Sequence, residues 1–162
     1  MKLRMYQVDA FSEKLFTGNP AAVVILESSL KDSVMQSIAL ENNLSETAFV
    51  SIYQSPIYIR WFTPSTEVDL CGHATLASAR ILFEYYPELA GEEIIFDSKS
   101  GILKVAKNKD NLCWNFPEDQ PVEVNPDPIF REILGIQPLK LLKGKDYYLA
   151  IFKNQNQIEQ IQ

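Results

Sequence analysis

The amino-acid sequence predicts an α+β domain in which a bent, mostly antiparallel sheet wraps around a central hydrophobic helix. Short apolar runs separated by turn residues occur both before and after residues 73–86, as expected for strands. Residues 73–86, HATLASARILFEYY, are dense in helix formers and apolar on nearly every side, which is typical of a buried helix. The turns between the strands are short, which favours antiparallel neighbours.

The first two strands follow from local patterns near the N-terminus. Residues 1–11, MKLRMYQVDAF, alternate in part between apolar and polar side chains, which predicts a strand. The Gly-Asn-Pro turn at residues 18–20 then leads into the continuous apolar run of residues 21–26. A run of this length without polar interruptions predicts a second strand, buried in the interior.

A helix is expected next, because Leu30, Val34 and Ile38 recur at helical intervals. One of the serines at 28–29 is suited to cap its first turn. The asparagines at 42–43 are suited to end it.

Two strands, residues 47–53 and 57–62, are rich in β-branched and aromatic residues and are joined by a short Gln-Ser-Pro turn. This arrangement predicts a hairpin. Residues 63–72, TPSTEVDLCG, are mostly turn formers and predict a loop that leads into the central helix at 73–86.

Three short runs follow the central helix, at residues 92–98, 101–108 and 111–118, and predict a three-stranded meander. After a proline-rich crossing, residues 127–135 predict a short helix that opens with an Asp-Pro cap and ends at a glycine. Residues 138–152 then predict one more hairpin.

The chain of 162 residues has room for one ordinary domain or for a compact pair of small ones. We expect a single α+β domain over residues 1–152 and a polar tail over residues 153–162.

Composition excludes several classes of function. The net charge of −6 and the scattered lysines and arginines argue against a nucleic-acid partner and against binding to an anionic membrane surface. No apolar run approaches the length of about 20 residues that a spanning helix needs. The N-terminus also lacks the apolar stretch of a signal peptide, so a cytoplasmic location is the expectation.

The content of cysteine and histidine gives little support for metal chemistry. Two cysteines, Cys71 and Cys113, are too few for a disulfide framework. His73 is the only histidine, so no ligand set for a structural zinc site is evident from the sequence, and neither a metal nor an organic cofactor is expected.

The segment Cys71-Gly72-His73 is the first candidate site, because it lies where the expected loop meets the expected central helix. The unpaired N–H groups and the dipole of a helix start favour a bound carboxylate. Gly72 would let a ligand approach the backbone, and His73 could exchange a proton with it. Cys71 at such a position should have a lowered thiol pKa. The alternative is an ordinary helix start in which these residues only pack and cap.

Glu46 and Asn19 are the other candidates. Glu46 lies between a polar turn and an apolar strand, so it could be a partly desolvated carboxylate that acts as acid and base by turns. Its alternative is a solvated turn glutamate. Asn19 could bind a carboxylate through its amide, or it could simply be a turn asparagine before proline.

Three segments together identify a family resemblance: VDAFSEKLFTGNPAAVV, IALENNLSETAFV and RWFTPSTEVDLCGHATLASA. In this order and spacing they resemble the N-terminal half of the PhzF-like phenazine-biosynthesis proteins, which have the diaminopimelate-epimerase-like fold. The resemblance covers the chain from its first strand to about Phe152. It implies an isomerase that moves a proton next to a carboxylate, with no metal or organic cofactor.

The resemblance also implies roles for individual residues. Glu46 matches the family's general acid/base, and His73 and Gly72 match the histidine and glycine at the same helix start. Asn19 matches a turn that contacts substrate. By their places in the matching motifs, four further residues are expected to bind substrate: Ser45, Asp69, Ala74 and Thr75.

This sequence departs from the family pattern at one position and in length. Diaminopimelate epimerase carries Cys-Gly-Asn where this chain has Cys71-Gly72-His73, and the phenazine enzyme lacks the thiol, so Cys71 could be a base, a packing residue or a relic. The chain also ends where the first half of the fold should connect to the second. We therefore expect a second half-domain as a partner, and little turnover by this chain alone.

Two functions remain open from the sequence. The first is isomerase-type proton transfer on a small carboxylate-bearing substrate. The second is a non-catalytic binding or self-associating protein that keeps the fold, with a homodimer imitating the two-halved arrangement.

Overall fold

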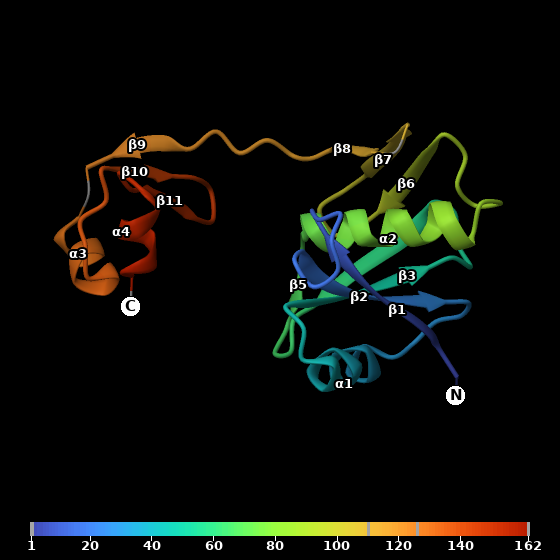
Figure 1. Cartoon of the computed structure of the whole chain (residues 1–162). Coiled ribbons are helices and arrows are strands. Elements are labelled where there is room, and N and C mark those ends of the chain that lie inside the picture. The colour runs from blue at the N-terminus through green and yellow to red at the C-terminus, as the bar shows by residue number, and fades with distance from the viewer. Residues whose placement is uncertain (1, 110, 126, 162) are drawn as a thin grey trace. The chain divides into compact units, whose positions relative to one another are not determined.

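The structure is a computed structural model and describes residues 2–109, 111–125 and 127–161. The chain divides into two compact units, unit 1 (residues 1–116) and unit 2 (residues 117–162) (Figure 1). Both units combine strands with helices, and the α+β class predicted from the sequence is confirmed.

Unit 1 is built on a mostly antiparallel sheet. Adjacent, hydrogen-bonded strands follow the order β1-β2-β3-β4-β6-β7-β8. The short strand β5 pairs with β4 and is not part of this order. The pairs β2–β3 and β4–β6 are parallel, and the other pairs are antiparallel. The strands are β1 (Arg4–Ala10), β2 (Asn19–Leu26), β3 (Glu46–Ser51), β4 (Ile57–Phe62), β5 (Glu67–Val68), β6 (Glu93–Asp97), β7 (Leu103–Asn108) and β8 (Asn111–Asn115).

Strand β2 supplies side chains to two cores, which explains its unbroken apolar run. Val23 and Ile25 belong to the larger core, which also contains the buried side chains of α2 (Gly72–Tyr85). Val24 and Leu26 belong to the smaller core, together with those of α1 (Asp32–Asn42). Because successive side chains of a strand point to opposite faces, the sheet is covered by one helix on each side (Figure 1).

Helix α2 is the predicted central helix. It packs against β1, β2, β3 and β8. Ala74, Ala79 and Leu82 are fully buried, and only a narrow stripe near its C-terminal end, including Arg80 and Glu84, is exposed. Such burial all round requires a helix without a polar face, as the sequence indicates.

Helix α1 ends as predicted but begins later. Asn43 adopts the left-handed conformation at its C-terminus, with φ of 51°, so the prediction that an asparagine ends it is confirmed. The predicted serine cap is wrong. The backbone is still extended at Lys31, which precedes the first helical residue and forms no side-chain cap, so Ser28 and Ser29 lie outside the helix.

Unit 2 contains a three-stranded sheet in the order β11-β10-β9 and two short helices. Asp127 accepts a hydrogen bond from the Ile129 N–H at 3.0 Å, and Gly135 has φ of 69°, so the predicted cap and stop of the helix are confirmed. The elements are β9 (Val122–Val124), α3 (Pro128–Leu134), β10 (Lys140–Lys143), β11 (Tyr148–Ile151) and α4 (Gln155–Glu159).

The division between the units falls after Phe116, whereas the sequence analysis places a boundary after residue 152. Residues 117–121 are all exposed, so no buried side chain anchors this stretch. The expected polar tail at 153–162 contains α4. Among the residues that the structure describes, no helix is both long and apolar enough to cross a membrane.

Candidate active site

The parallel pairing of β2 with β3 brings two candidate residues to one edge of the sheet. In this register Ala21 lies opposite Glu46, so Asn19 and Glu46 both lie at the beginning of their strands. Asn42 donates a hydrogen bond from Nδ2 to Thr47 Oγ1 at 3.2 Å, which ties the end of α1 to the first residues of β3. The backbone around Glu46 is therefore held by α1 before it and by the β2–β3 pairing after it.

The start of α2 reaches the same edge and brings His73 to Glu46. Glu46 Oε2 lies 3.4 Å from His73 Nε2, and Ser45 Oγ lies 3.5 Å from the same nitrogen. The other ring nitrogen, Nδ1, lies 3.4 Å from Cys71 Sγ. The imidazole thus stands between a carboxylate and a thiol, which is an arrangement suited to passing protons.

These three side chains differ in their contact with solvent. The side chain of His73 is 9% exposed and that of Glu46 is 21% exposed. Cys71 is buried within the larger core. The carboxylate is therefore the member of the group that a ligand would meet first. One ligand atom from each of the three residues lies within 4.8 Å of the others, so the group could also hold a metal ion.

The thiol of Cys71 does not have the lowered pKa predicted from its place at a helix start. Burial raises its pKa to about 12, and the neighbouring Glu46 carboxylate acts in the same direction. The backbone N–H groups of Ala74 and His73 act in the opposite direction but do not outweigh burial. The sequence-based prediction is wrong here, because sequence position alone does not reveal how deeply the sulfur is buried.

The first turn of α2 uses its other side chains for structure. The Thr75 hydroxyl donates to the Cys71 carbonyl at 2.6 Å, and both Ala74 and Thr75 are fully buried. Their side chains are therefore not available to a ligand. At Gly72 an added Cβ would lie 3.4 Å from the Phe116 ring, at van der Waals contact distance, so this ring covers that side of the glycine.

The remaining predicted residues lie at the margin of this group. Asn19 and Asp69 are exposed. The Asp69 carbonyl accepts a hydrogen bond from Ser100 Oγ at 2.8 Å, which holds the backbone of the loop before Cys71. Contacts thus join Ser45, Glu46, Cys71 and His73, while no recorded side-chain contact joins Asn19 or Asp69 to them among the described residues.

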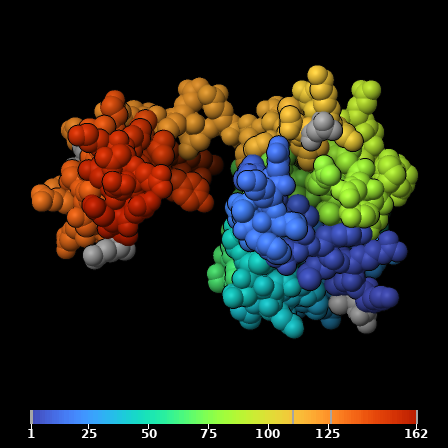
Figure 2. Space-filling model, in the orientation of Figure 1, coloured from blue at the N-terminus to red at the C-terminus, as the bar shows by residue number. Residues whose placement is uncertain are grey.

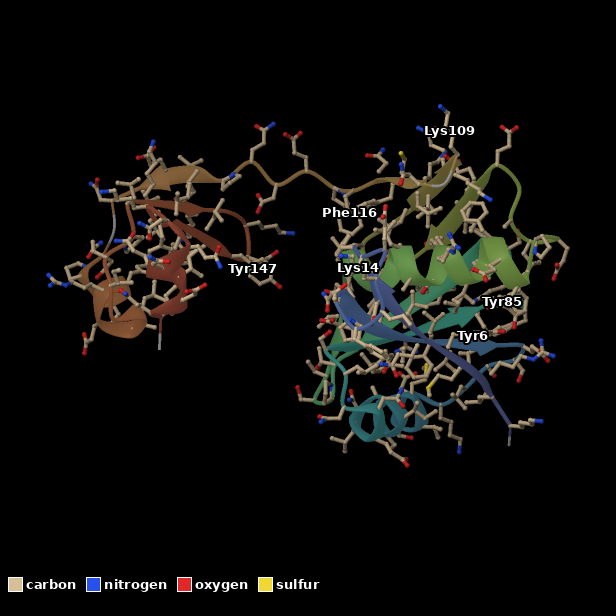
Figure 3. All side chains as sticks on the ribbon, viewed as in Figure 1. Tyr6, Lys14, Tyr85, Lys109, Phe116 and Tyr147 are labelled. Atoms are coloured by element: carbon tan, nitrogen blue, oxygen red, sulfur yellow. The ribbon has the colours of Figure 1, made fainter. Side chains whose placement is uncertain are left out.

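Sequence reasoning missed an aromatic row beside Gly72. The ring centroids of Phe11 and Trp114 are 6.2 Å apart, and those of Trp114 and Phe116 are 5.9 Å apart. Figure 3 shows Phe116 near the start of α2, and Tyr6 and Tyr85, which stack on each other, near the C-terminal end of α2. The segment NLCWNFPE indicated only a strand, and nothing in it signalled contact with a glycine some 40 residues earlier.

Sequence reasoning also missed an ion-pair network at the loop that leads to Cys71. Arg60 binds Glu67 through Nε at 2.7 Å and Nη2 at 2.9 Å, and Asp32 through Nη1 at 2.7 Å. Lys99 also pairs with Glu67. Hydrogen bonds from Arg60 lower the pKa of Glu67 and of Asp32, and the pKa of Arg60 is raised in turn. The network fixes β5 against β4.

Comparison with known proteins shows close relatives. The sequence pattern of the family described as phenazine biosynthesis-like protein matches residues 8–128. An uncharacterized isomerase of Pseudomonas aeruginosa is 46% identical over 158 residues, which cover 98% of this chain and 60% of that protein. An uncharacterized isomerase of Halalkalibacterium halodurans is 46% identical over 164 residues, which cover 99% of this chain and 61% of that protein.

A solved structure agrees with this result. The crystal structure of a PhzF-family phenazine biosynthesis protein from Enterococcus faecalis matches with a TM-score of 0.87 at 43% identity, covering 100% of this chain and 62% of that one. The chain therefore spans about 60% of the length of the relatives that it matches.

Proposed function

Since this chain belongs to the phenazine biosynthesis-like protein family, we propose that it carries the proton-transfer group of an isomerase that acts next to the carboxylate of a small acid. The observation that supports this most directly is the convergence of Glu46, His73 and Cys71 at the first turn of α2. A half-buried carboxylate beside an imidazole, at a helix start that favours anions, suits such a reaction.

In this proposal Glu46 is the acid and base. Its carboxylate takes a proton from a carbon of the substrate, and the electron pair left behind spreads onto the substrate carboxylate. The N–H groups at the start of α2 stabilise that charge. Glu46 then returns the proton to a conjugated carbon on the same face of the substrate. The scheme assigns no role to an organic cofactor.

His73 and Cys71 take supporting roles. His73 Nε2 lies 3.4 Å from the Glu46 carboxylate, so it can orient Glu46 or exchange a proton with it. Cys71 lies behind the imidazole, at Nδ1, where it fixes the orientation of the ring. Because burial raises the thiol pKa to about 12, the proposal ranks Cys71 third as a base.

Deuterium uptake from solvent tests the central role of Glu46. Small amino acids and dihydroanthranilate-like acids would be incubated in D₂O and followed by NMR at the α- and γ-carbons. Both this chain and a chimera completed with the remaining part of the Pseudomonas aeruginosa relative would be measured. The chain alone should exchange slowly, because the relatives are longer and catalysis needs a water-excluded site.

In the chimera, Glu46→Gln should lower exchange by roughly 100-fold or more, since a positioned acid/base contributes on that order. Glu41→Gln is the matched control, because Glu41 is an exposed carboxylate on α1, outside the described group. Full exchange in the Glu46→Gln chimera would refute the central role. An equal loss in both variants would refute it too, because the effect would then not belong to the site.

A second function, self-association without catalysis, is favoured by one feature of unit 1. The loop between β1 and β2 exposes Leu15 by 80% and Phe16 by 93%. This loop belongs to the blue part of the surface in Figure 2. Apolar side chains exposed together often mark an interaction surface. We propose that this loop would carry such an association, and sedimentation velocity at micromolar concentration tests it. A dimer that Phe16→Ser dissociates would support the idea, and a strict monomer would refute it.

A further inference from the structure

We propose that Cys71 is a positioning residue, whose S–H group donates a hydrogen bond to His73 Nδ1 and so fixes the neutral imidazole as the tautomer that carries its proton on Nε2. The two ring nitrogens face different groups. Nδ1 lies 3.4 Å from Cys71 Sγ, while Nε2 lies 3.4 Å from Glu46 Oε2 and 3.5 Å from Ser45 Oγ. Which nitrogen of a histidine carries the proton is set by the hydrogen bond that the other nitrogen makes.

The carboxylate side of the ring requires a donor. An ionised carboxylate can only accept hydrogen bonds, and Glu46 must be ionised to act as the base of the proposed reaction. Nε2 of His73 therefore carries a proton where it faces Glu46 Oε2. In a neutral imidazole one nitrogen is a donor and the other an acceptor, so Nδ1 is left as an acceptor that needs a donor.

The thiol of Cys71 supplies that donor. Burial raises its pKa to about 12, so the sulfur keeps its proton at neutral pH. Cys71 is only 7% exposed, and a polar hydrogen buried to this degree finds its partner within the protein. The Cys71 carbonyl is already occupied, because it accepts from the N–H and the hydroxyl of Thr75, at 3.2 Å and 2.6 Å. The backbone N–H groups of His73 and Ala74 act on the sulfur as donors, so they cannot accept its hydrogen.

The Glu46 carboxylate is the competing acceptor for the thiol proton. It lies within 4.8 Å of the sulfur, and it also raises the thiol pKa. The recorded hydrogen-bond contact of the Cys71 side chain is nevertheless with His73 Nδ1, at 3.4 Å. Glu46 in turn faces the opposite nitrogen of the ring, so the contacts form a chain from thiol to imidazole to carboxylate.

This tautomer decides between the two roles that the proposed function leaves to His73, and its meaning for catalysis rests on that function. With its proton on Nε2, the imidazole offers Glu46 a donor and no lone pair at that nitrogen. It therefore orients the carboxylate and does not accept the proton that Glu46 removes from the substrate. The proton stays on Glu46 until it returns to the substrate, and Cys71 keeps the ring in the required state.

Nitrogen NMR of the whole chain labelled with ¹⁵N-histidine tests the tautomer, because His73 is the only histidine and gives one pair of ring signals. Couplings to the hydrogens on the ring carbons distinguish Nε2 from Nδ1. At neutral pH we expect Nε2 to have the chemical shift of a protonated nitrogen and Nδ1 that of an unprotonated one. A protonated Nδ1, or an imidazolium with protons on both nitrogens, would overturn the proposal.

Variants separate the effect of the thiol from that of the carboxylate. Glu46→Gln replaces the carboxylate by an amide that can both donate and accept, so the thiol alone should then hold the proton on Nε2. Adding Cys71→Ala to this variant should lower the ratio of the two tautomers by about threefold to tenfold, which corresponds to the loss of one hydrogen bond. Cys71→Ser keeps a donor and should restore the ratio. Cys113→Ala is the matched control and should not change it, because Cys113 is an exposed thiol on β8.

A tautomer ratio that Cys71→Ala leaves unchanged would overturn the role of Cys71. So would a ratio in Cys71→Ser no higher than in Cys71→Ala, or an equal loss in Cys113→Ala.

The infrared S–H stretching band gives a second measurement that does not depend on a variant of Cys71. In Cys113→Ser the one remaining thiol is Cys71, and its band should lie below that of a thiol free of hydrogen bonds. Adding Glu46→Gln should leave the band in place, whereas a shift would make Glu46 the acceptor and overturn the bond to Nδ1. None of these measurements requires turnover, so their failure is distinguishable from failure of the proposed isomerase activity.

Discussion

The two units of this chain differ in how many apolar side chains each one buries in its own interior. Unit 1 has two cores with many fully buried side chains, including Trp61, Phe49 and Phe96. In unit 2, Leu141 and Pro138 are the only buried apolar side chains among the described residues. Large hydrophobic side chains are instead exposed on its helices, its strands and the segments between them: Val122, Ile129, Ile133, Leu139, Tyr147, Tyr148, Leu149, Ile151 and Ile158.

Regular secondary structure therefore does not by itself imply a stable unit. The elements of unit 2 follow from local signals, such as the Asp127 cap and the Gly135 stop. Burial of apolar surface is the main favourable term in folding, at roughly 25 cal/mol per Å². A three-stranded sheet with two short helices buries little of it, so we expect amide hydrogen exchange to be fastest in unit 2. The candidate site lies wholly within the better-packed unit 1.

The largest expected effect comes from a cavity in unit 1. Phe96 is fully buried in the larger core, so Phe96→Ala should lower the free energy of unfolding by about 3–5 kcal/mol. Ile133→Ala removes a side chain that is 63% exposed in unit 2 and should change it by about 0.5 kcal/mol or less. Urea unfolding followed by circular dichroism measures both, and equal effects would break the comparison between the units.

Replacing a glycine by alanine should destabilise unit 1 more than unit 2. An added Cβ at Gly18 would lie 2.5 Å from the Ala10 carbonyl oxygen in unit 1, where paired strands cannot yield. Gly18→Ala should therefore cost about 1–3 kcal/mol. At Gly144 in unit 2 the nearest atom is the Asp119 carboxylate, whose side chain can rotate away. Thermal unfolding should show a clearly smaller loss for Gly144→Ala, and the reverse order would contradict this account.

Helix caps test the role of local signals in unit 2. Asp127→Ala removes the acceptor of the Ile129 N–H bond and should destabilise α3 by about 1 kcal/mol. Lys31 provides no side-chain cap for α1, so Lys31→Asp should stabilise unit 1 by a few tenths of a kcal/mol. Hydrogen exchange at residues 129–134 and 32–42 would measure the two effects. Slower exchange in Asp127→Ala would count against the cap.

The smallest effect at neutral pH is expected from the Arg60 network, because ion pairs near a surface contribute little. Arg60 lowers the pKa of Glu67 below its ordinary value of 4.5, so the ionised form stabilises the fold. That contribution is present above pH 4.5 and is lost as pH falls through the lowered pKa. Acid unfolding of Glu67→Gln should therefore be less steep in this range than that of the unchanged chain.

The matched control for this network is the exposed pair of Glu123 and Lys140 in unit 2, with side chains 60% and 52% exposed. Glu123→Gln should leave the acid unfolding curve unchanged within about 0.5 kcal/mol. A larger effect of Glu123→Gln than of Glu67→Gln would refute the assignment of acid sensitivity to the Arg60 network.

Much of the fold could be predicted because its signals are local. The apolar residues 73–86, the hairpin turn before β4 and the Asp-Pro start of α3 each depend on a few neighbouring residues, and all three predictions are confirmed. The family predicted from the three motifs is confirmed as well. The serine cap of α1 failed, because two turn-forming serines do not specify which later residue opens the helix.

The candidate residues could be chosen from the sequence, because Glu46, Cys71 and His73 each lie where a predicted loop meets a predicted helix or strand. Their contacts with one another depend on the folded chain. The packing of α2 against β2 and β3 brings His73 to within 3.4 Å of Glu46, which is far from it in sequence. Burial also raises the pKa of a thiol that a helix start alone would lower. Secondary-structure propensities act between residues that are neighbours in sequence. Desolvation and the geometry of a site depend instead on residues far apart in sequence that are brought together by folding.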